Sequence, residues 1–158
     1  MDFSFLSQYL SPEAVTFIVS MLPVSELRGA IPLAIGVYNI DPIKAYVISV
    51  VGNMVPVFFL LLLVDKVSAA LSKESTLFER FFRWQFEHTR RKNADKFQKW
   101  GSLALVVFVA IPLPVTGAWS GSIAAFVFGI PFKKAFPLIF AGVLIAGLIV
   151  SGLTLGIL

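Results

Sequence analysis

The chain of 158 residues contains no cysteine, only one histidine (His88), and few charged residues, which make up 14% of it. The lack of cysteine excludes disulfides, thiolate metal ligands and covalent thiol chemistry. A single histidine also excludes most histidine-based metal centres. We therefore expect no metal, no cofactor and no enzymatic activity.

The scarcity of charge is most pronounced in three stretches. Residues 45–64, 100–132 and 135–158 contain no Asp, Glu, Lys or Arg. A helix needs about 20 apolar residues to cross a bilayer, and ordinary soluble domains contain about a quarter charged residues. The sequence therefore predicts an all-α polytopic integral membrane protein.

The positive charge of the chain is concentrated in one segment, residues 65–100. It holds nine Lys/Arg and five Asp/Glu, whereas the acidic and basic residues outside it cancel. Acidic residues precede basic ones by four positions at Glu79/Arg83, Glu87/Arg91 and Asp95/Lys99, a spacing that supports a helix. We expect a basic amphipathic linker helix on the cytoplasmic side, against lipid or against the protein's own surface, with both termini outside. No folded basic domain surrounds this charge, so nucleic acid is not an expected partner.

An internal repeat relates the two apolar parts of the chain. A shift of 89 residues aligns Pro23 with Pro112, Pro42 with Pro131, and Lys44 with Lys133. Each half then reads as two short apolar arms around a proline-containing break, followed by one long apolar span. Because proline interrupts helices and each arm is about half a bilayer long, the arms predict a re-entrant hairpin. Two short, tilted full spans are the alternative.

The predicted architecture is two inverted repeats, each a hairpin followed by a full transmembrane helix. The first membrane half covers residues 1–64, the linker 65–100 and the second half 101–158. The hairpins are expected at 13–40 and 101–130, and the full spans at 45–64 and 135–156.

Glu26 and Arg28 are two ionisable residues inside the first hairpin. Charged groups at membrane depth are costly and normally face a cavity or one another. Positions i and i+2 of a regular helix do not meet, so the pair requires a non-helical tip over residues 25–29. The two either form a structural ion pair or contact a substrate or a proton.

The second hairpin tip, residues 112–122, has no charge but offers Thr116 and backbone amides. If a helix begins at Ala118, its N-terminal amides favour an anion, and with Arg28 they could cradle a phosphate or carboxylate group. Gly117 and Gly121 also suit close helix packing. Asn53, in the first full span, lines the same cavity or forms an interhelical hydrogen bond.

The stretches "LPVSELRGAIPLAIG" and "IPLPVTGAWSGSIAA" resemble the family of small multidrug export proteins. That family looks distantly related to the DedA superfamily, whose members are linked to lipid translocation. The resemblance covers nearly the whole chain and implies a multi-pass protein of the prokaryotic plasma membrane, with two re-entrant hairpins and a homodimeric assembly. The site residues that it implies are Glu26, Arg28, Gly29 and Pro32 from the first stretch, and Pro112, Pro114, Thr116, Gly117 and Gly121 from the second.

Three functions fit these residues. The first is a proton-coupled transporter or flippase for an anionic amphiphile such as a lipid-linked phosphate, with Arg28 on the head group and Glu26 carrying the proton. The second is a proton-coupled exporter of cationic drugs, in which Glu26 binds the cation; the neighbouring Arg28 disfavours it. The third is a non-transporting membrane scaffold. Membrane lipids and a small molecule are the expected partners.

Overall fold

The computed structural model describes residues 10–74, 101–112 and 116–157, with only the backbone described for residues 64–74. In these parts of the chain every regular element is a helix. The order is α1 (Pro12–Met21), α2 (Glu26–Pro32), the π-helical segment η2 (Leu33–Val37), α3 (Pro42–Glu74), the helix Gly101–Ala110, α5 (Ala118–Val127) and α6 (Phe132–Thr154).

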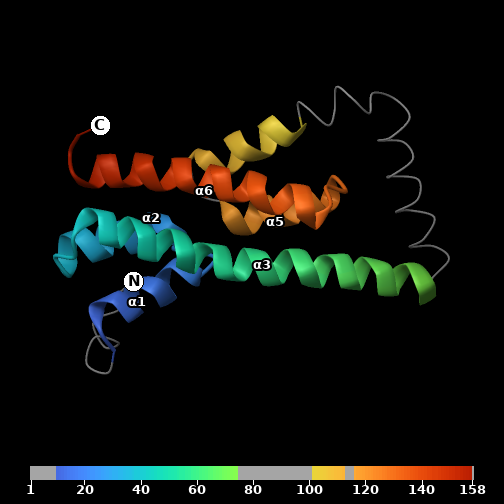
Figure 1. The fold of residues 1–158 in the computed structure, drawn as a ribbon, viewed down its shortest axis with the longest axis horizontal. Coiled ribbons are helices and arrows are strands. Elements are labelled where there is room, and N and C mark those ends of the chain that lie inside the picture. The colour runs from blue at the N-terminus through green and yellow to red at the C-terminus, as the bar shows by residue number, and fades with distance from the viewer. Residues whose placement is uncertain (1–9, 75–100, 113–115, 158) are drawn as a thin grey trace.

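The helices α3 and α6 are long and apolar enough to cross a bilayer, over Pro42–Leu63 and Phe132–Thr154. They lie side by side in opposite directions (Figure 1). Phe58, in the later part of the α3 span, contacts Phe132 at the start of α6, whereas Tyr46, near the start of α3, donates a hydrogen bond to the carbonyl of Leu144 further along α6. In each span less than half of the apolar segment is buried in the protein, 39% and 33%. Their outer faces are therefore apolar, which suits contact with lipid rather than water.

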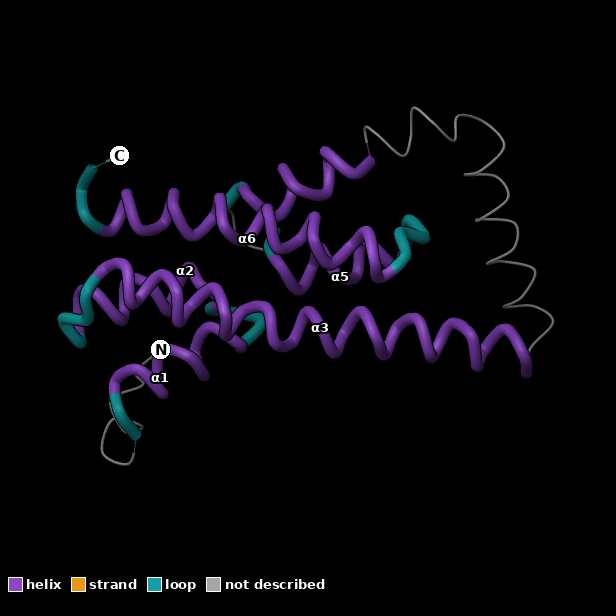
Figure 2. The backbone as a smooth tube through the Cα atoms, viewed as in Figure 1, coloured by secondary structure: helices purple, strands orange, loops and turns teal. Residues whose placement is uncertain are grey.

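The first hairpin, α1 with α2, lies along the first half of α3 (Figures 1 and 2). Ser11 caps α1 by accepting a hydrogen bond from the Ala14 amide at 3.3 Å. Near the start of α3, Lys44 pairs with Glu13 of α1 at 2.8 Å. About two turns further along α3, Gly52 contacts Ser20 of α1. Hence α1 runs parallel to α3 and ends near the middle of the span.

The second hairpin, the helix Gly101–Ala110 with α5, lies along α6 in a similar way. A Cβ on Gly142 would stand 2.7 Å from Cβ of Val109, so the last turn of this helix packs against the middle of α6. α5 begins at Ala118 and returns to the N-terminal end of α6. Both hairpins thus reach only to the middle of the long helices, and their turns meet there.

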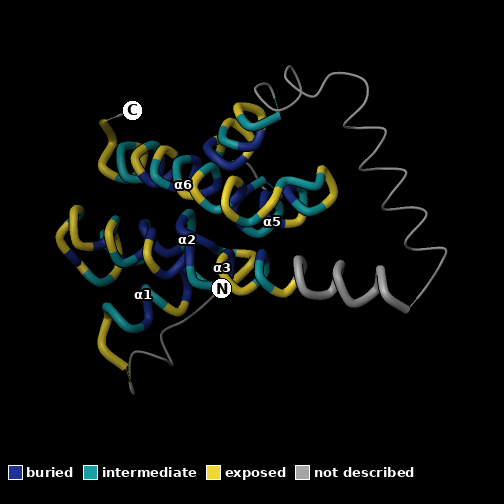
Figure 3. Tube along the Cα trace, turned by 45° about the vertical axis from the view of Figure 1, so that its right-hand side comes forward, coloured by how far each residue is buried: buried dark blue, intermediate teal, exposed yellow. Residues whose placement is uncertain are grey.

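The core of the described residues lies between the hairpins and the long helices. Leu27 and Ile31 of α2, Val57 of α3 and Ile139 of α6 are buried in one cluster, which also contains Val109. Figure 3 shows buried residues on the inner faces of the helices and exposed residues on the outer faces. The hairpins therefore supply the interior packing that α3 and α6 need.

The predicted spans lie close to the observed ones. The apolar span of α3 is Pro42–Leu63, against a predicted 45–64, while the helix itself continues to Glu74 and is not broken by Pro56. The predicted second span, 135–156, begins at Phe132 instead. The linker helix predicted over 65–100, with His88, falls outside the described residues from position 75 onward.

Candidate functional site

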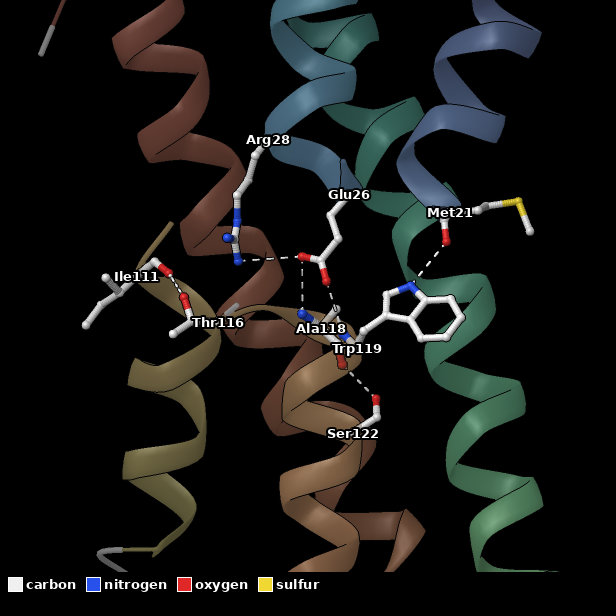
Figure 4. Close-up of polar contacts among 8 residues, drawn as sticks. All are labelled: Met21, Glu26, Arg28, Ile111, Thr116, Ala118, Trp119 and Ser122. Carbon is white, nitrogen blue, oxygen red and sulfur yellow. Dashed lines mark hydrogen bonds and ion pairs between the residues drawn. The ribbon is translucent and has the colours of Figure 1, made fainter. Parts of the chain in front are cut away.

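Glu26 opens α2 in an unusual backbone conformation. Its φ is +47°, a left-handed value that non-glycine residues seldom adopt. The amide of Glu26 donates to the carbonyl of Leu22 at 2.9 Å, which closes the turn between α1 and α2. As Figure 4 shows, the side chain reaches from α2 across to the beginning of α5.

The Glu26 carboxylate is held by three groups. Oε1 accepts a hydrogen bond from the amide of Trp119 at 3.2 Å, and Oε2 accepts one from the amide of Ala118 at 3.4 Å. Arg28 Nη2 lies 3.6 Å from Oε2, and only 7% of the Glu26 side chain is exposed. The first amides of a helix have no partner within it and carry partial positive charge, so this carboxylate lies where an anion is most stabilised.

Gly117 allows this close approach. It immediately precedes α5, and a Cβ at this position would collide with Glu26 Oε2 and would lie 2.5 Å from Arg28 Nη2. Its φ of +153° is also one that side chains rarely adopt. The position therefore requires glycine for both space and conformation.

Trp119 adds a second connection between the hairpin turns. Its indole Nε1 donates to the carbonyl of Met21, the last residue of α1, at 3.1 Å (Figure 4). Sequence reasoning did not single out Trp119. Its amide follows from the predicted start of a helix at Ala118, but nothing in the local pattern indicates that the indole reaches α1.

The structure brings some of the predicted site residues together and leaves others apart. Glu26, Arg28 and Gly117 form one cluster at the N-terminus of α5. Thr116 instead donates to the carbonyl of Ile111 at 2.8 Å, which closes its own loop. A Cβ on Gly121 would press on Val109 in the neighbouring helix, so this glycine serves helix packing.

The remaining predicted residues shape the hairpins. Gly29 lies close to Ser25, since a Cβ on it would be 2.8 Å from the Cβ of Ser25. Pro32 ends α2 and is followed by the π-helical segment η2, so the chain continues as a helix past this proline. Pro112 follows the helix Gly101–Ala110, and Pro114 is outside the described residues.

The expectation of a non-helical tip over residues 25–29 is wrong. Residues 26–29 are helical rather than part of a non-helical tip, and Glu26 still meets Arg28 because its left-handed backbone redirects the side chain. Of the two alternatives for Asn53, the interhelical hydrogen bond is not seen among the described residues. Its side chain is buried, and neither Oδ1 nor Nδ2 has a hydrogen-bond partner among the described residues.

A match to a known protein family covers the Glu26 cluster and most of the chain. A family model described as "Putative small multi-drug export protein" matches residues 26–149, from the buried glutamate into the last third of α6. The chain belongs to this family. Among curated proteins and solved structures, no match to the chain was found.

Membership of the small multi-drug export family agrees with the two apolar spans, and the chain is a membrane protein. Within the described residues no three His, Cys, Asp or Glu side chains gather in a way that could hold a metal ion. The cluster around Glu26 is instead suited to holding an anion, and its present occupant is the protein's own carboxylate.

Proposed function

We propose that the chain translocates an anionic amphiphile across the bilayer, and that a phosphate or carboxylate head group takes the place of the Glu26 carboxylate. The observation that carries this proposal is the hold on Glu26 by Arg28 and by the amides of Ala118 and Trp119. A guanidinium and the N-terminal amides of a helix are the donors that recognise phosphate in proteins. Glu26 therefore acts as an internal substitute for the head group.

Protonation of Glu26 would couple the exchange between Glu26 and the head group to the movement of a proton. A neutral carboxyl is a weaker acceptor and does not attract Arg28, so the protonated side chain would leave the amides of α5. The head group could then bind Arg28, and loss of the proton would allow Glu26 to displace it. This sequence of steps makes Glu26 the proton carrier and Arg28 the head-group ligand.

The two-hairpin arrangement supports a particular placement in the membrane. We infer that the halves are inverted repeats whose re-entrant hairpins enter from opposite faces and meet near the middle of the bilayer. Irregular backbone at that depth is tolerated where protein shields it or where it lines a cavity. The plasma membrane of a prokaryote, a cytoplasmic linker and a homodimer complete this proposal.

A second candidate function is proton-coupled export of cationic drugs, which the family description favours. In that case the released Glu26 carboxylate would bind the cation. Its three donors count against this role, because the cation would have to compete with Arg28 for the same oxygen, at 3.6 Å. An anionic head group would bind to Arg28 rather than compete with it, once protonation has released Glu26.

Reconstituted proteoliposomes distinguish these functions. The assay compares labelled polyprenyl phosphate, labelled phospholipid and a cationic dye, each with and without a pH gradient. We expect transport of the phosphate-bearing lipid, dependent on the gradient and lost in Glu26→Gln. Arg28→Lys keeps the charge but not the planar, two-pronged guanidinium, so it should reduce transport more than protein yield.

Each alternative outcome of the proteoliposome assay argues against one part of the proposed function. Transport of the dye alone would replace the proposed function with the second candidate. Movement of none of the three compounds by well-folded protein would favour a non-transporting scaffold. Transport by Glu26→Gln at the wild-type rate would remove Glu26 from the mechanism.

A further inference from the structure

Trp119, at the start of α5, is hydrogen-bonded to both helices of the first hairpin. Its backbone amide donates to Glu26 Oε1 of α2 at 3.2 Å, and its indole Nε1 donates to the carbonyl of Met21 in α1 at 3.1 Å (Figure 4). The last carbonyls of a helix have no partner within it, so the indole supplies one to the final residue of α1. One residue of the second hairpin therefore joins the two arms of the first at the point where they turn.

The two bonds of Trp119 differ in their dependence on charge. The bond to Glu26 is strongest while the carboxyl is ionised, because a charged acceptor forms the stronger hydrogen bond. The indole N–H is only a donor and its partner is a backbone carbonyl, so neither group of the second bond titrates. Protonation of Glu26 therefore weakens the first bond and leaves the second intact.

The packing of α5 gives these bonds their importance. Among the described residues, α5 packs mainly along α3 and α6 rather than along α1 or α2. The side chains of Glu26 and Trp119 bridge from α5 to the first hairpin. The indole bond is a bridge of this kind that does not require Glu26.

We propose that Trp119 is a positioning residue for transport. Its indole bond keeps the amides of Ala118 and Trp119 beside the first hairpin and Arg28 after Glu26 has been protonated, so that the head group meets its donors already in place. This inference rests on the proposed function. A binding site that is assembled for only a fraction of the time loses apparent affinity by that fraction, so the indole bond sets how tightly the head group is held.

Spin labels on α1 and α5 test whether the indole bond holds the two helices together. Ile18 and Ile123 are exposed, and each lies about one turn from the bond, so single cysteines at both positions can be labelled in this cysteine-free chain. The full chain is placed in lipid nanodiscs, and pulsed electron paramagnetic resonance gives the distribution of distances between the labels. The measurement is made in a background with Glu26→Gly and Arg28→Gln. This background removes the carboxylate together with its cation, and glycine accepts the left-handed backbone of position 26.

In this background we expect the labels to keep the narrow, wild-type distribution of distances. Adding Trp119→Phe should lengthen and broaden it, because phenylalanine keeps the backbone amide and an aromatic ring but has no N–H donor. Tyr46→Phe is the matched control. It also deletes one bond of 3.1 Å from an aromatic side chain to a carbonyl, that of Leu144, but between α3 and α6, so it should leave the distribution unchanged.

Three results would overturn the positioning role. Labels that already separate in the background would mean that the indole bond cannot hold the helices by itself. An unchanged distribution after Trp119→Phe would mean that the bond is not needed, and an equal effect of Tyr46→Phe would mean that any such bond acts in the same way. Glu26→Gln replaces the background should the latter fail to fold.

Transport kinetics provide the second measurement, with Glu26 and Arg28 intact. Per folded molecule, Trp119→Phe should raise the KM for labelled polyprenyl phosphate several-fold and leave the maximal rate close to wild type. A lower protein yield with an unchanged KM would show that Trp119 only stabilises the fold, and would overturn the positioning role. If wild type moves no phosphate-bearing lipid, the proposed function fails, whereas the label distances still decide whether the indole holds α5 to the first hairpin.

Discussion

Glu26 combines a strained backbone with a buried charge, and the same contacts stabilise both. A left-handed backbone costs an L-residue about 1–2 kcal/mol, and burying an unpaired carboxylate would cost more. The amides of α5 and the guanidinium of Arg28 compensate the charge, and in doing so they hold the backbone in this conformation. An observed backbone outlier at such a contact is the kind that accompanies function.

Substitution of the ion pair separates a structural role from a substrate role. Arg28→Gln alone leaves a buried carboxylate without its cation and should lower stability by about 3–5 kcal/mol. The double variant Glu26→Gln with Arg28→Gln removes both charges and should recover most of the yield and the unfolding temperature. Because the head-group ligand is gone, we expect this folded double variant to remain inactive, as measured by transport per folded molecule.

The opposite outcome for the double variant is informative. Wild-type transport without either charge would mean that the pair only neutralises itself, and the substrate role of Arg28 would have to be abandoned.

Gly117 provides a second test at the residue scale. Gly117→Ala adds a methyl group that collides with Glu26 Oε2, so we expect a loss of about 1–3 kcal/mol together with reduced transport. Gly36→Ala is the matched control, because a Cβ there meets nothing within 4 Å and should leave the unfolding temperature nearly unchanged. Equal unfolding temperatures for the two variants would show that the close approach at Gly117 is absent in the folded protein.

At the scale of the elements, the first hairpin is held at both of its ends. The first hairpin is joined to α3 at its outer end by Glu13 and Lys44, and its turn is joined to α5 by Trp119 and Glu26. A helix of about ten residues is marginal by itself, so these connections and the packing of α2 determine where the hairpin lies.

The Glu13–Lys44 pair predicts a pH-dependent contribution to stability. The hydrogen bond and charge of Lys44 lower the pKa of Glu13 below its ordinary value of 4.5. A lowered folded-state pKa stabilises the protein above the unfolded-state pKa, and this stabilisation is lost as the pH falls through the folded-state value. At low salt, wild type should therefore unfold at a slightly higher temperature than Lys44→Gln at pH 7, with the difference disappearing as the pH falls below 4.5 and through the lower folded-state pKa of Glu13.

Lys133→Gln is the control for this measurement, since it removes the same charge at the start of α6. Its difference from wild type should not follow the titration of Glu13. Because the pair is exposed, high salt should also abolish the effect of Lys44→Gln. A difference that stays constant as the pH falls from 7 through the folded-state pKa of Glu13 would contradict the role of the pair.

At the scale of the whole molecule, the distribution of charge predicts the orientation in the membrane. Single cysteines are placed in this cysteine-free chain at Ala70 and at Ile157, and intact cells are treated with an impermeant maleimide. We expect labelling at position 157 and not at 70, because the basic linker should remain in the cytoplasm. The reverse pattern would mean that the orientation is inverted, and equal labelling would contradict opposite sides for the two positions.

The sequence alone was sufficient for the helical class and for the two spans. Both follow from composition, since charge-free stretches of sufficient length have few alternatives in a bilayer. It also led to a helix start at Ala118 and to a pairing of Glu26 with Arg28, from the position of prolines and the cost of charge. These are local properties of the chain.

Only the tertiary structure decided which group accepts the hydrogen bonds of the first amides of α5. The sequence predicted an anion site there for a substrate, whereas Glu26, 92 residues from Ala118 in the chain, fills it. The hydrogen bond from the Trp119 indole to Met21, and the Asn53 amide that has no partner among the described residues, likewise could not be predicted from the local pattern. Each of these contacts depends on how closely two helices approach that are distant in the sequence. That approach is set where glycines such as Gly52, Gly117 and Gly142 pack against another segment, and neither segment alone specifies it.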